Sequence, residues 1–227
     1  VGFALARGGT GSWAVGIPFL VGWIVSPAVA WWTSRATRVG GSAPLRPQDA
    51  RALRGVARRT WRFFETFVTP ADNMLPPDNF QADPAPVVAH RTSPTNLGLC
   101  LLSTLAARDF GWIGTFDAAD RLEATLDSMG RLERFRGHLY NWYDTQDLRP
   151  LEPKYVSTVD SGNLAGHLIT AARACREAIE RPLLGPQWLS GTSDGLDLAR
   201  EALAAMAGAN PTETVTWKHL GEALDLF

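Results

Sequence analysis

The chain has 227 residues, of which 45% are hydrophobic and 20% are charged, and this composition supports a packed core and excludes a disordered chain. Its formal net charge of -1 excludes a polycationic surface that would hold phosphates, so we expect no nucleic-acid partner. The two cysteines, Cys100 and Cys175, lie in apolar periodic stretches, which predicts buried, reduced thiols rather than a disulfide framework.

The first element in chain order is an uncharged apolar segment over residues 11–33. At about 1.5 Å per helical residue, about 20 such residues cross the hydrocarbon core of a membrane. Trp13 lies at one end, and Trp31 and Trp32 at the other, as is typical of aromatic belts at membrane interfaces. The segment therefore predicts one transmembrane helix, with a buried helix of a soluble protein as the alternative. Arginines are more frequent after it than before it, which predicts that the rest of the chain faces the cytoplasm.

A stretch rich in Gly, Ser and Pro over residues 39–47 predicts a linker. Residues 47–67 then place apolar side chains at steps of three and four, which predicts an amphipathic helix. We interpret its opposite face as solvated, with contact to lipid headgroups as the alternative. That face carries Arg51, Arg54, Arg58, Arg59 and Arg62.

Five further helices are predicted, and no stretch alternates as a strand would, so the part after the linker is expected to be all-α. Ser93 and Pro94 supply the N-cap and first-turn proline of a helix through Arg108, which Gly111 closes. The next begins at Thr115 and is expected to bury Phe116, Ala119, Leu122, Leu126, Met129 and Leu132. A helix over 161–179 is expected to bury Leu164, Leu168, Ala171 or Ala172, and Cys175. The last two are predicted over 193–209 and 211–226.

The connections between these helices are unequal in length. If successive helices run antiparallel, the long loops over 69–92 and 135–160 emerge on one side, and the short turn near 111–115 lies on the other. Loops of this length in a compact domain are usually functional. Repeated helix pairs whose long loops share one face predict a partial (α/α) toroid.

The two long loops combine aromatic rings with carboxylates and amides, which is the chemistry that binds a carbohydrate. The aromatic rings are Phe80, Tyr140, Trp142 and Tyr143, and the polar groups are Asp78, Asn79, Gln81, Asn141, Asp144 and Asp160. The alternative for Trp142 and Tyr143 is that they hold the loop on the core. Asp144 and Asp160 are the loop carboxylates best placed for glycoside chemistry, although Asp160 is equally suited to cap the next helix.

The sequence has no motif typical of metal binding or nucleotide binding. The histidines His90, His138 and His167 lack the spacing of metal ligands, so we expect structural roles and no metal. The sequence has neither a phosphate-binding loop nor a dinucleotide-binding turn, and we expect no cofactor in this segment.

Three motifs resemble the cyclic beta-1,2-glucan synthases: LPPDNFQ at 75–81, HRTSPTNLGLCLLSTLAARDFGWI at 90–113, and RFRGHLYNWYDTQDLRPLEPKYVSTVDSGNLAGHLI at 134–169. The resemblance implies a multidomain enzyme of the bacterial inner membrane that builds the glucan from UDP-glucose. In that family a helical, glucoamylase-like middle domain cyclises linear beta-1,2-glucan by transglycosylation, and a phosphorylase-like region trims it. The family pattern often has an aromatic residue where this chain has Cys100 and Leu139.

For this chain, the resemblance implies a transmembrane segment with its flanks over 1–38, a linker over 39–47, and a truncated N-terminal half of the glucoamylase-like barrel over 48–227. The catalytic carboxylates are expected downstream of Phe227, so the fragment alone is expected to be inactive. Its expected partners are the glucan chain, the lipid bilayer and the remaining domains of the polypeptide. Its expected contribution is part of the glucan cleft, formed by Asp78, Asn79, Gln81, His90, Arg91, Asn96, Trp142, Tyr143, Asp144, Asp160 and Asn163.

Two other functions remain open on these residues. One is a beta-glucan hydrolase or phosphorylase on the same fold, and the other is a membrane-anchored glycan-binding module without chemistry.

Overall fold

A computed structural model describes residues 10–35, 45–183 and 185–209. It divides into two compact units, Val1–Leu45 and Arg46–Phe227. Most of the predicted linker and the predicted helix over 211–226 lie outside the described residues.

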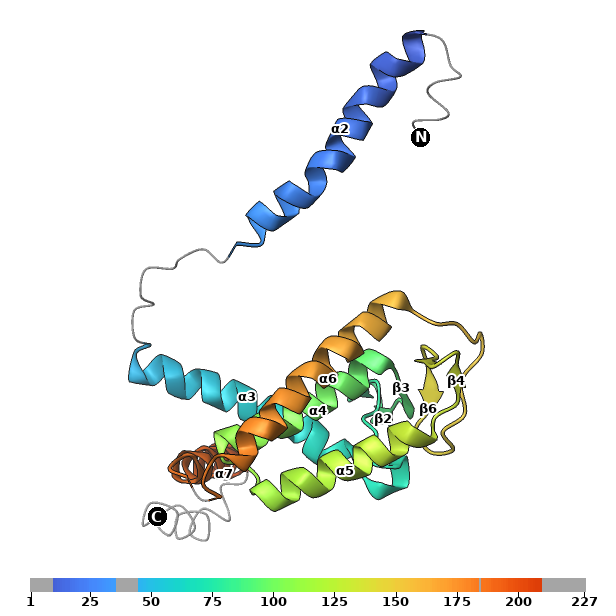
Figure 1. Cartoon of the computed structure of the whole chain (residues 1–227). Coiled ribbons are helices and arrows are strands. Elements are labelled where there is room, and N and C mark those ends of the chain that lie inside the picture. The colour runs from blue at the N-terminus through green and yellow to red at the C-terminus, as the bar shows by residue number, and fades with distance from the viewer. Residues whose placement is uncertain (1–9, 36–44, 184, 210–227) are drawn as a thin grey trace. The chain divides into compact units, whose positions relative to one another are not determined.

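In the described part of the first unit, the helix α2 runs over Thr10–Thr33 (Figure 1), which confirms the predicted apolar helix. Its segment Gly16–Thr33 has a mean hydropathy of 1.3 and is long and apolar enough to cross a membrane. Pro18 and Pro27 lie inside the helix. Proline is tolerated in membrane-spanning helices because neighbouring helices and side chains satisfy the backbone groups that it frees. Its large apolar side chains point outward all round the helix, as in a span and unlike an amphipathic surface helix.

The second unit is helical, as predicted, and is organised around α4, which packs against each of the other long helices among its described residues. Its elements are α3 (Pro47–Phe67), the short 3-10 helix η1 (Pro70–Asp72), α4 (Pro94–Phe110), α5 (Thr115–Arg131), α6 (Thr158–Ile179) and α7 (Gln187–Ala209). In Figure 1, α4 and α6 run in the same direction and α5 runs against them.

The ends of α4 are set by the residues predicted to set them. The Ser93 hydroxyl accepts a hydrogen bond from the backbone N–H of Asn96 at 3.2 Å, and Pro94 is the first helical residue. Gly111 ends the helix with φ at 81°, a conformation that favours glycine. A Cβ at this position would lie 2.2 Å from the carbonyl oxygen of Gln187, so the start of α7 also requires a glycine here.

Three antiparallel two-residue ribbons lie within the loops. They pair β1 (Phe80–Gln81) with β2 (Val87–Val88), β3 (Arg91–Thr92) with β6 (Tyr143–Asp144), and β4 (Arg134–Phe135) with β5 (His138–Leu139). The β3–β6 ribbon joins the two long loops, with Arg91 opposite Asp144 and Thr92 opposite Tyr143. The prediction that these loops lie on one side is therefore confirmed, although strands of two residues are too short to show a period in the sequence.

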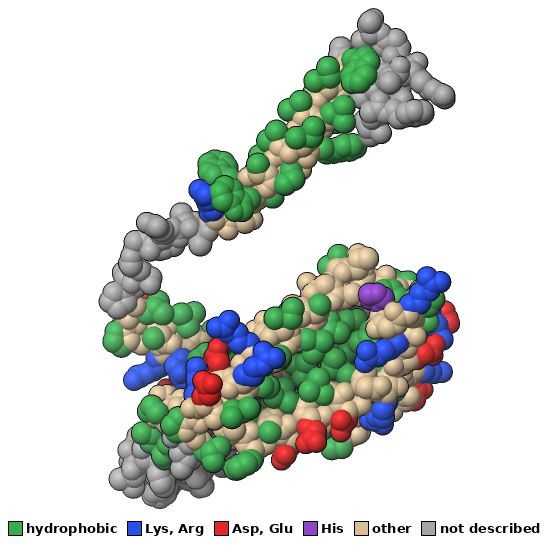
Figure 2. All heavy atoms as spheres, in the orientation of Figure 1, with side chains coloured by type: hydrophobic (Ala, Val, Ile, Leu, Met, Phe, Trp, Pro, Cys, Tyr) green, Lys and Arg blue, Asp and Glu red, His purple; other side chains and the backbone are tan. Residues whose placement is uncertain are grey.

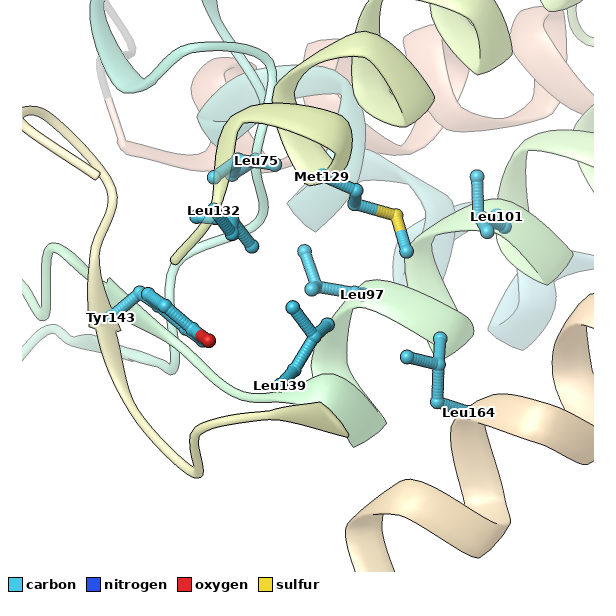
Figure 3. Packing of buried hydrophobic residues seen from close by; sticks show 8 residues of the cluster. All are labelled: Leu75, Leu97, Leu101, Met129, Leu132, Leu139, Tyr143 and Leu164. Atoms are coloured by element: carbon cyan, nitrogen blue, oxygen red, sulfur yellow. The ribbon is translucent and has the colours of Figure 1, made fainter. Parts of the chain in front are cut away.

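The core lies beneath these loops (Figure 3). It is formed by Leu75, Leu97, Leu101, Met129, Leu132, Leu139, Tyr143 and Leu164, which come from α4, α5, α6 and both long loops. The hydroxyl of Tyr143 donates to the carbonyl of Glu133 and accepts from the N–H of Tyr140, each at 2.6 Å. The loops thus contribute core residues and are fixed to the helices.

The predicted buried face of α5 was partly wrong. Phe116 and Leu126 are 72% and 45% exposed, whereas Thr125 and Ser128 are buried. Their hydroxyls donate to the main-chain carbonyls of residues 74 and 73, at 3.0 and 2.6 Å. Compared with the predicted orientation, α5 is rotated about its axis, so that its hydroxyls meet main-chain carbonyls of the first long loop. Those carbonyls would otherwise be buried without a hydrogen-bond donor.

The predicted buried face of α6 was also partly wrong. Leu164 and Ala171 are buried, whereas Leu168 and Cys175 are exposed, so only a narrow stripe of α6 contacts α4. Cys100 is buried as predicted, and both thiols are free.

Candidate functional site

Both α4 and α6 begin at the end of the unit where the two long loops meet (Figure 1). Ser93 caps the first of these helices and Ser157 caps the second. The main-chain N–H groups of a first helical turn have no partner inside the helix and carry partial positive charge. This end therefore combines polar backbone with the loop residues predicted to bind sugar.

Asp78 is the centre of the first half of the site. One of its carboxylate oxygens accepts from Nε and Nη2 of Arg91, at 3.1 and 2.9 Å, and from Nδ2 of Asn79 at 3.1 Å. The other accepts from Nδ2 of Asn96, on α4, at 3.3 Å. The Arg91 guanidinium lies over the ring of Trp142, 4.8 Å from its centroid. Residues from both loops and from α4 are thus brought together.

Asp160 is the centre of the second half. One oxygen accepts from the Thr95 hydroxyl at 2.6 Å and the other from the Ser157 hydroxyl at 2.5 Å, and Ser157 in turn accepts from the N–H of Asp160. Asn163 donates to Thr95 at 3.1 Å. Burial alone would raise the pKa of Asp160, but the hydrogen bonds from Ser157 and Thr95 outweigh it and lower that pKa. Asp160 therefore stabilises the start of α6 in its ionised form, as the third residue of the helix rather than its N-cap.

Asn141 connects the two halves. The positions of its amide oxygen and nitrogen are assigned from the neighbouring donors and acceptors. In this assignment, the oxygen accepts from Nε1 of Trp142 at 2.8 Å and from the Tyr155 hydroxyl at 2.7 Å. The nitrogen then donates to Asp160 at 3.0 Å. Asn141 is only 6% exposed, and a buried amide is stable only when its hydrogen bonds are made. One continuous polar network thus runs from Asp78 through Trp142 to Asp160.

The network contains most of the residues that the sequence predicted for the site. They are Asp78, Asn79, Arg91, Asn96, Trp142, Asp160 and Asn163. The sequence did not indicate that Thr95 and Asn141 connect these residues. Asn141 belonged to the same sugar-compatible stretch, but only the fold brings its amide between Trp142 and Asp160.

Two predicted residues support the second loop from inside. Tyr143 is fully buried, and burial raises the pKa of its hydroxyl to about 12. Asp144 accepts from the backbone N–H groups of Gln146 and Asp147, at 2.8 and 3.1 Å, and so stabilises the turn that follows β6.

His90 and Gln81 lie outside the network. Nδ1 of His90 is 2.7 Å from the buried carboxylate of Asp72, which also accepts from the Thr145 hydroxyl at 2.6 Å. The exposed Gln81 donates to the carbonyl of Asp83 at 2.9 Å. Among the described residues, no three His, Cys, Asp or Glu side chains gather as a metal site requires.

A second feature is an apolar groove of about 700 Å³ between α5 and α6, with Leu105 of α4 among its lining residues. Leu122, Leu126 and Ile179 contribute to its walls. Figure 2 shows the hydrophobic side chains that line the hollow between these helices. Such a surface suits the packing of another helix and offers few partners for sugar hydroxyls. The polar network is therefore the better candidate for a carbohydrate site.

Comparison with known proteins agrees with the motifs. No family model matches the chain. A cyclic beta-(1,2)-glucan synthase of Rhizobium meliloti (strain 1021) is 50% identical to it over 195 residues, which are 86% of this chain and 7% of that protein. Among solved structures, a putative glucoamylase from Bacteroides fragilis aligns with a TM-score of 0.46 and 19% identity, over 60% of this chain and 37% of that chain. The resemblance predicted from the sequence is thus confirmed, and this chain matches a short segment of the cyclic beta-1,2-glucan synthases.

Proposed function

We propose that the chain contributes part of the glucan-binding cleft of a domain that cyclises linear beta-1,2-glucan by transglycosylation. The observation that carries the proposal is the polar network around Trp142, in a chain 50% identical to a cyclic beta-(1,2)-glucan synthase over 195 residues. In this proposal residues 1–38 anchor the protein, 39–47 link it, and 48–227 form the N-terminal half of an (α/α) barrel.

The chemistry of the network suits a glucan chain. A glucosyl ring presents C–H groups on its faces and hydroxyls around its edge. The partly exposed indole of Trp142 can stack on such a face, and the exposed guanidinium of Arg91 can donate to hydroxyls of a neighbouring glucosyl unit of the chain. Asp78 pairs with Arg91 and holds it in place, so little side-chain freedom is lost when a sugar binds.

Cyclisation breaks one glucosidic bond and forms another. An enzyme carboxylate displaces the sugar on the reducing side of the cleaved bond, and that sugar leaves with a proton on its freed 2-oxygen. The 2-hydroxyl at the other end of the retained chain then gives up its proton and displaces the carboxylate from the anomeric carbon, so no water is consumed. Retaining chemistry of this kind uses two carboxyl groups about 5 to 5.5 Å apart. Both oxygens of Asp160 accept hydrogen bonds within the protein, and we propose that the reacting carboxylates belong to other parts of a larger polypeptide.

The setting follows from the same proposal. The matched synthase is about fourteen times longer than the aligned segment, since that segment covers 7% of it. We propose that α2 spans the bacterial inner membrane, that the second unit faces the cytoplasm, and that other domains of the polypeptide use UDP-glucose as the donor.

Binding of glucan to the chain tests the proposal. The chain from Val1 to Phe227 is placed in lipid nanodiscs and titrated with linear beta-1,2-glucan by calorimetry, with beta-1,4-glucan of equal length as the comparison. We expect saturable binding of the beta-1,2-glucan that Trp142→Ala weakens by about tenfold, the loss of one aromatic stacking contact. The matched control is Trp188→Ala, which removes an exposed tryptophan at the start of α7 and should leave affinity unchanged.

The product separates the cyclase from the alternatives. The open reading frame that encodes this chain is expressed whole and incubated with linear beta-1,2-glucan, and the products are weighed by mass spectrometry. Cyclic products, lighter by one water than linear chains of equal length, support the proposal. Without any cyclic product, shorter linear chains indicate a hydrolase, and sugar phosphates formed in the presence of phosphate indicate a phosphorylase. Binding without turnover indicates a glycan-binding module.

A further inference from the structure

We infer that Trp142 is a one-sided stacking platform for a glucosyl ring, and that Arg91 and Asn141 are the residues that position it. The inference rests on the proposed function, which supplies the sugar. It adds a defined orientation of the ring and assigns a role to Asn141, a residue that does not itself have to touch the glucan.

The face of the indole is determined by Arg91. The guanidinium carbon lies 4.8 Å from the ring centroid, so one face of Trp142 is occupied by a cation. The guanidinium is itself held by two hydrogen bonds to Asp78, which is 19% exposed. A sugar ring can therefore stack only on the opposite face.

The rotation of the indole is determined by Asn141. A tryptophan ring is attached through an sp³–sp² bond whose torsion is broad, so packing or a hydrogen bond must select one orientation. The hydrogen bond from Nε1 to the Asn141 oxygen, at 2.8 Å, makes that selection. Asn141 is in turn held by Tyr155 and by Asp160, which connects it to the first turn of α6.

The backbone on both sides of the ring is equally constrained. The N–H of Asn141 donates to the carbonyl of Tyr155, and the carbonyl of Trp142 accepts from the N–H of Leu151, each at 2.9 Å. A platform held at its backbone, its edge and one face loses little freedom when a ligand binds. Such preorganisation raises affinity without any new contact to the ligand.

A double-mutant cycle on glucan binding tests the inference. We expect Asn141→Ala to weaken the affinity of the nanodisc-held chain for linear beta-1,2-glucan by about fivefold, as for loss of one hydrogen bond, and Trp142→Ala by about tenfold. In the Trp142→Ala background, Asn141→Ala should cost nothing more, because Asn141 acts only through the ring. Gln146→Ala, at an exposed position of the same loop, should leave affinity unchanged. If the two losses multiply instead, Asn141 does not act through Trp142 and the inference is refuted.

A second measurement does not require sugar. In ¹⁵N-tryptophan-labelled protein, the indole N–H of Trp142, identified by its absence in Trp142→Phe, should exchange slowly with solvent. Asn141→Ala should accelerate this exchange by at least about tenfold, as for the loss of one protecting hydrogen bond, at a temperature where thermal unfolding shows the variant to be still folded. Rapid exchange in the wild type would refute the platform even if glucan binds. Failure of the wild type to bind glucan, with slow exchange retained, would refute the proposed function and leave the indole held as described.

Discussion

Asp194 on α7 connects this helix to the rest of the unit, and its replacement by asparagine should loosen that connection. The carboxylate is 8% exposed and accepts from Nε and Nη2 of Arg54 on α3, at 3.1 and 2.6 Å. It also accepts from Nε1 of Trp112, beyond the end of α4, at 2.8 Å. An asparagine is nearly the same size, but it carries no charge and turns an NH₂ group toward these donors.

The stability lost in Asp194→Asn can be estimated from these contacts. Each hydrogen bond to a charged group is worth about 1.5 to 3 kcal/mol, and breaking a buried ion pair costs about 3 to 5 kcal/mol. The Arg54 side chain is 27% exposed, so water recovers part of that loss. We expect Asp194→Asn to destabilise the docking of α7 by about 2 to 3 kcal/mol.

The matched control lies on the same helix. Glu201 also pairs with an arginine of α3, Arg59, but both side chains are more than half exposed. An exposed ion pair is worth about 0 to 1 kcal/mol, so Glu201→Gln should change stability little. Hydrogen exchange of the α7 amides, followed by mass spectrometry, measures both variants. Equal exchange in Asp194→Asn and Glu201→Gln would refute the reasoning that burial of the pair determines its contribution.

Three further predictions concern single positions. Gly98→Ala should destabilise the unit by about 1 to 3 kcal/mol in thermal unfolding, because its Cβ would lie 2.2 Å from Nδ1 of His167; an unchanged midpoint would contradict this packing. Cys175 should react with a maleimide within minutes at pH 7.5, whereas burial raises the pKa of Cys100 to about 12 and should leave it unmodified until unfolding. Because the pKa of Asp160 is lowered, its contribution to stability is present above the ordinary pKa of an aspartate and is lost as the pH falls through the lowered pKa. Asp160→Asn should therefore flatten the acid limb of the stability curve, and a parallel curve would contradict it.

The helices were predictable from the sequence because their signals are local. Ser93, Pro94 and Gly111 define the ends of α4 through contacts within a few residues, and apolar spacing over 47–67 defines α3. The common side of the two long loops also followed from loop length and helix direction.

The buried faces of α5 and α6 could not be predicted from spacing. Phe116 and Cys175 fit an apolar period and are nevertheless exposed, whereas Ser128 is buried. The reason is that the helix α5 packs against loop carbonyls some 50 residues away in sequence, and those carbonyls require donors.

The residue types of the candidate site were determined by the sequence alone, as was the family that the motifs resemble. Only the tertiary structure decided their roles: it buried Tyr143, used Asp160 to stabilise a helix start, and placed Asn141 between Asp160 and Trp142. Caps and periods depend on neighbours in sequence, and so they can be read from the chain. A hydrogen-bond network depends on which distant segments the fold brings within about 3 Å, and no local pattern encodes that distance.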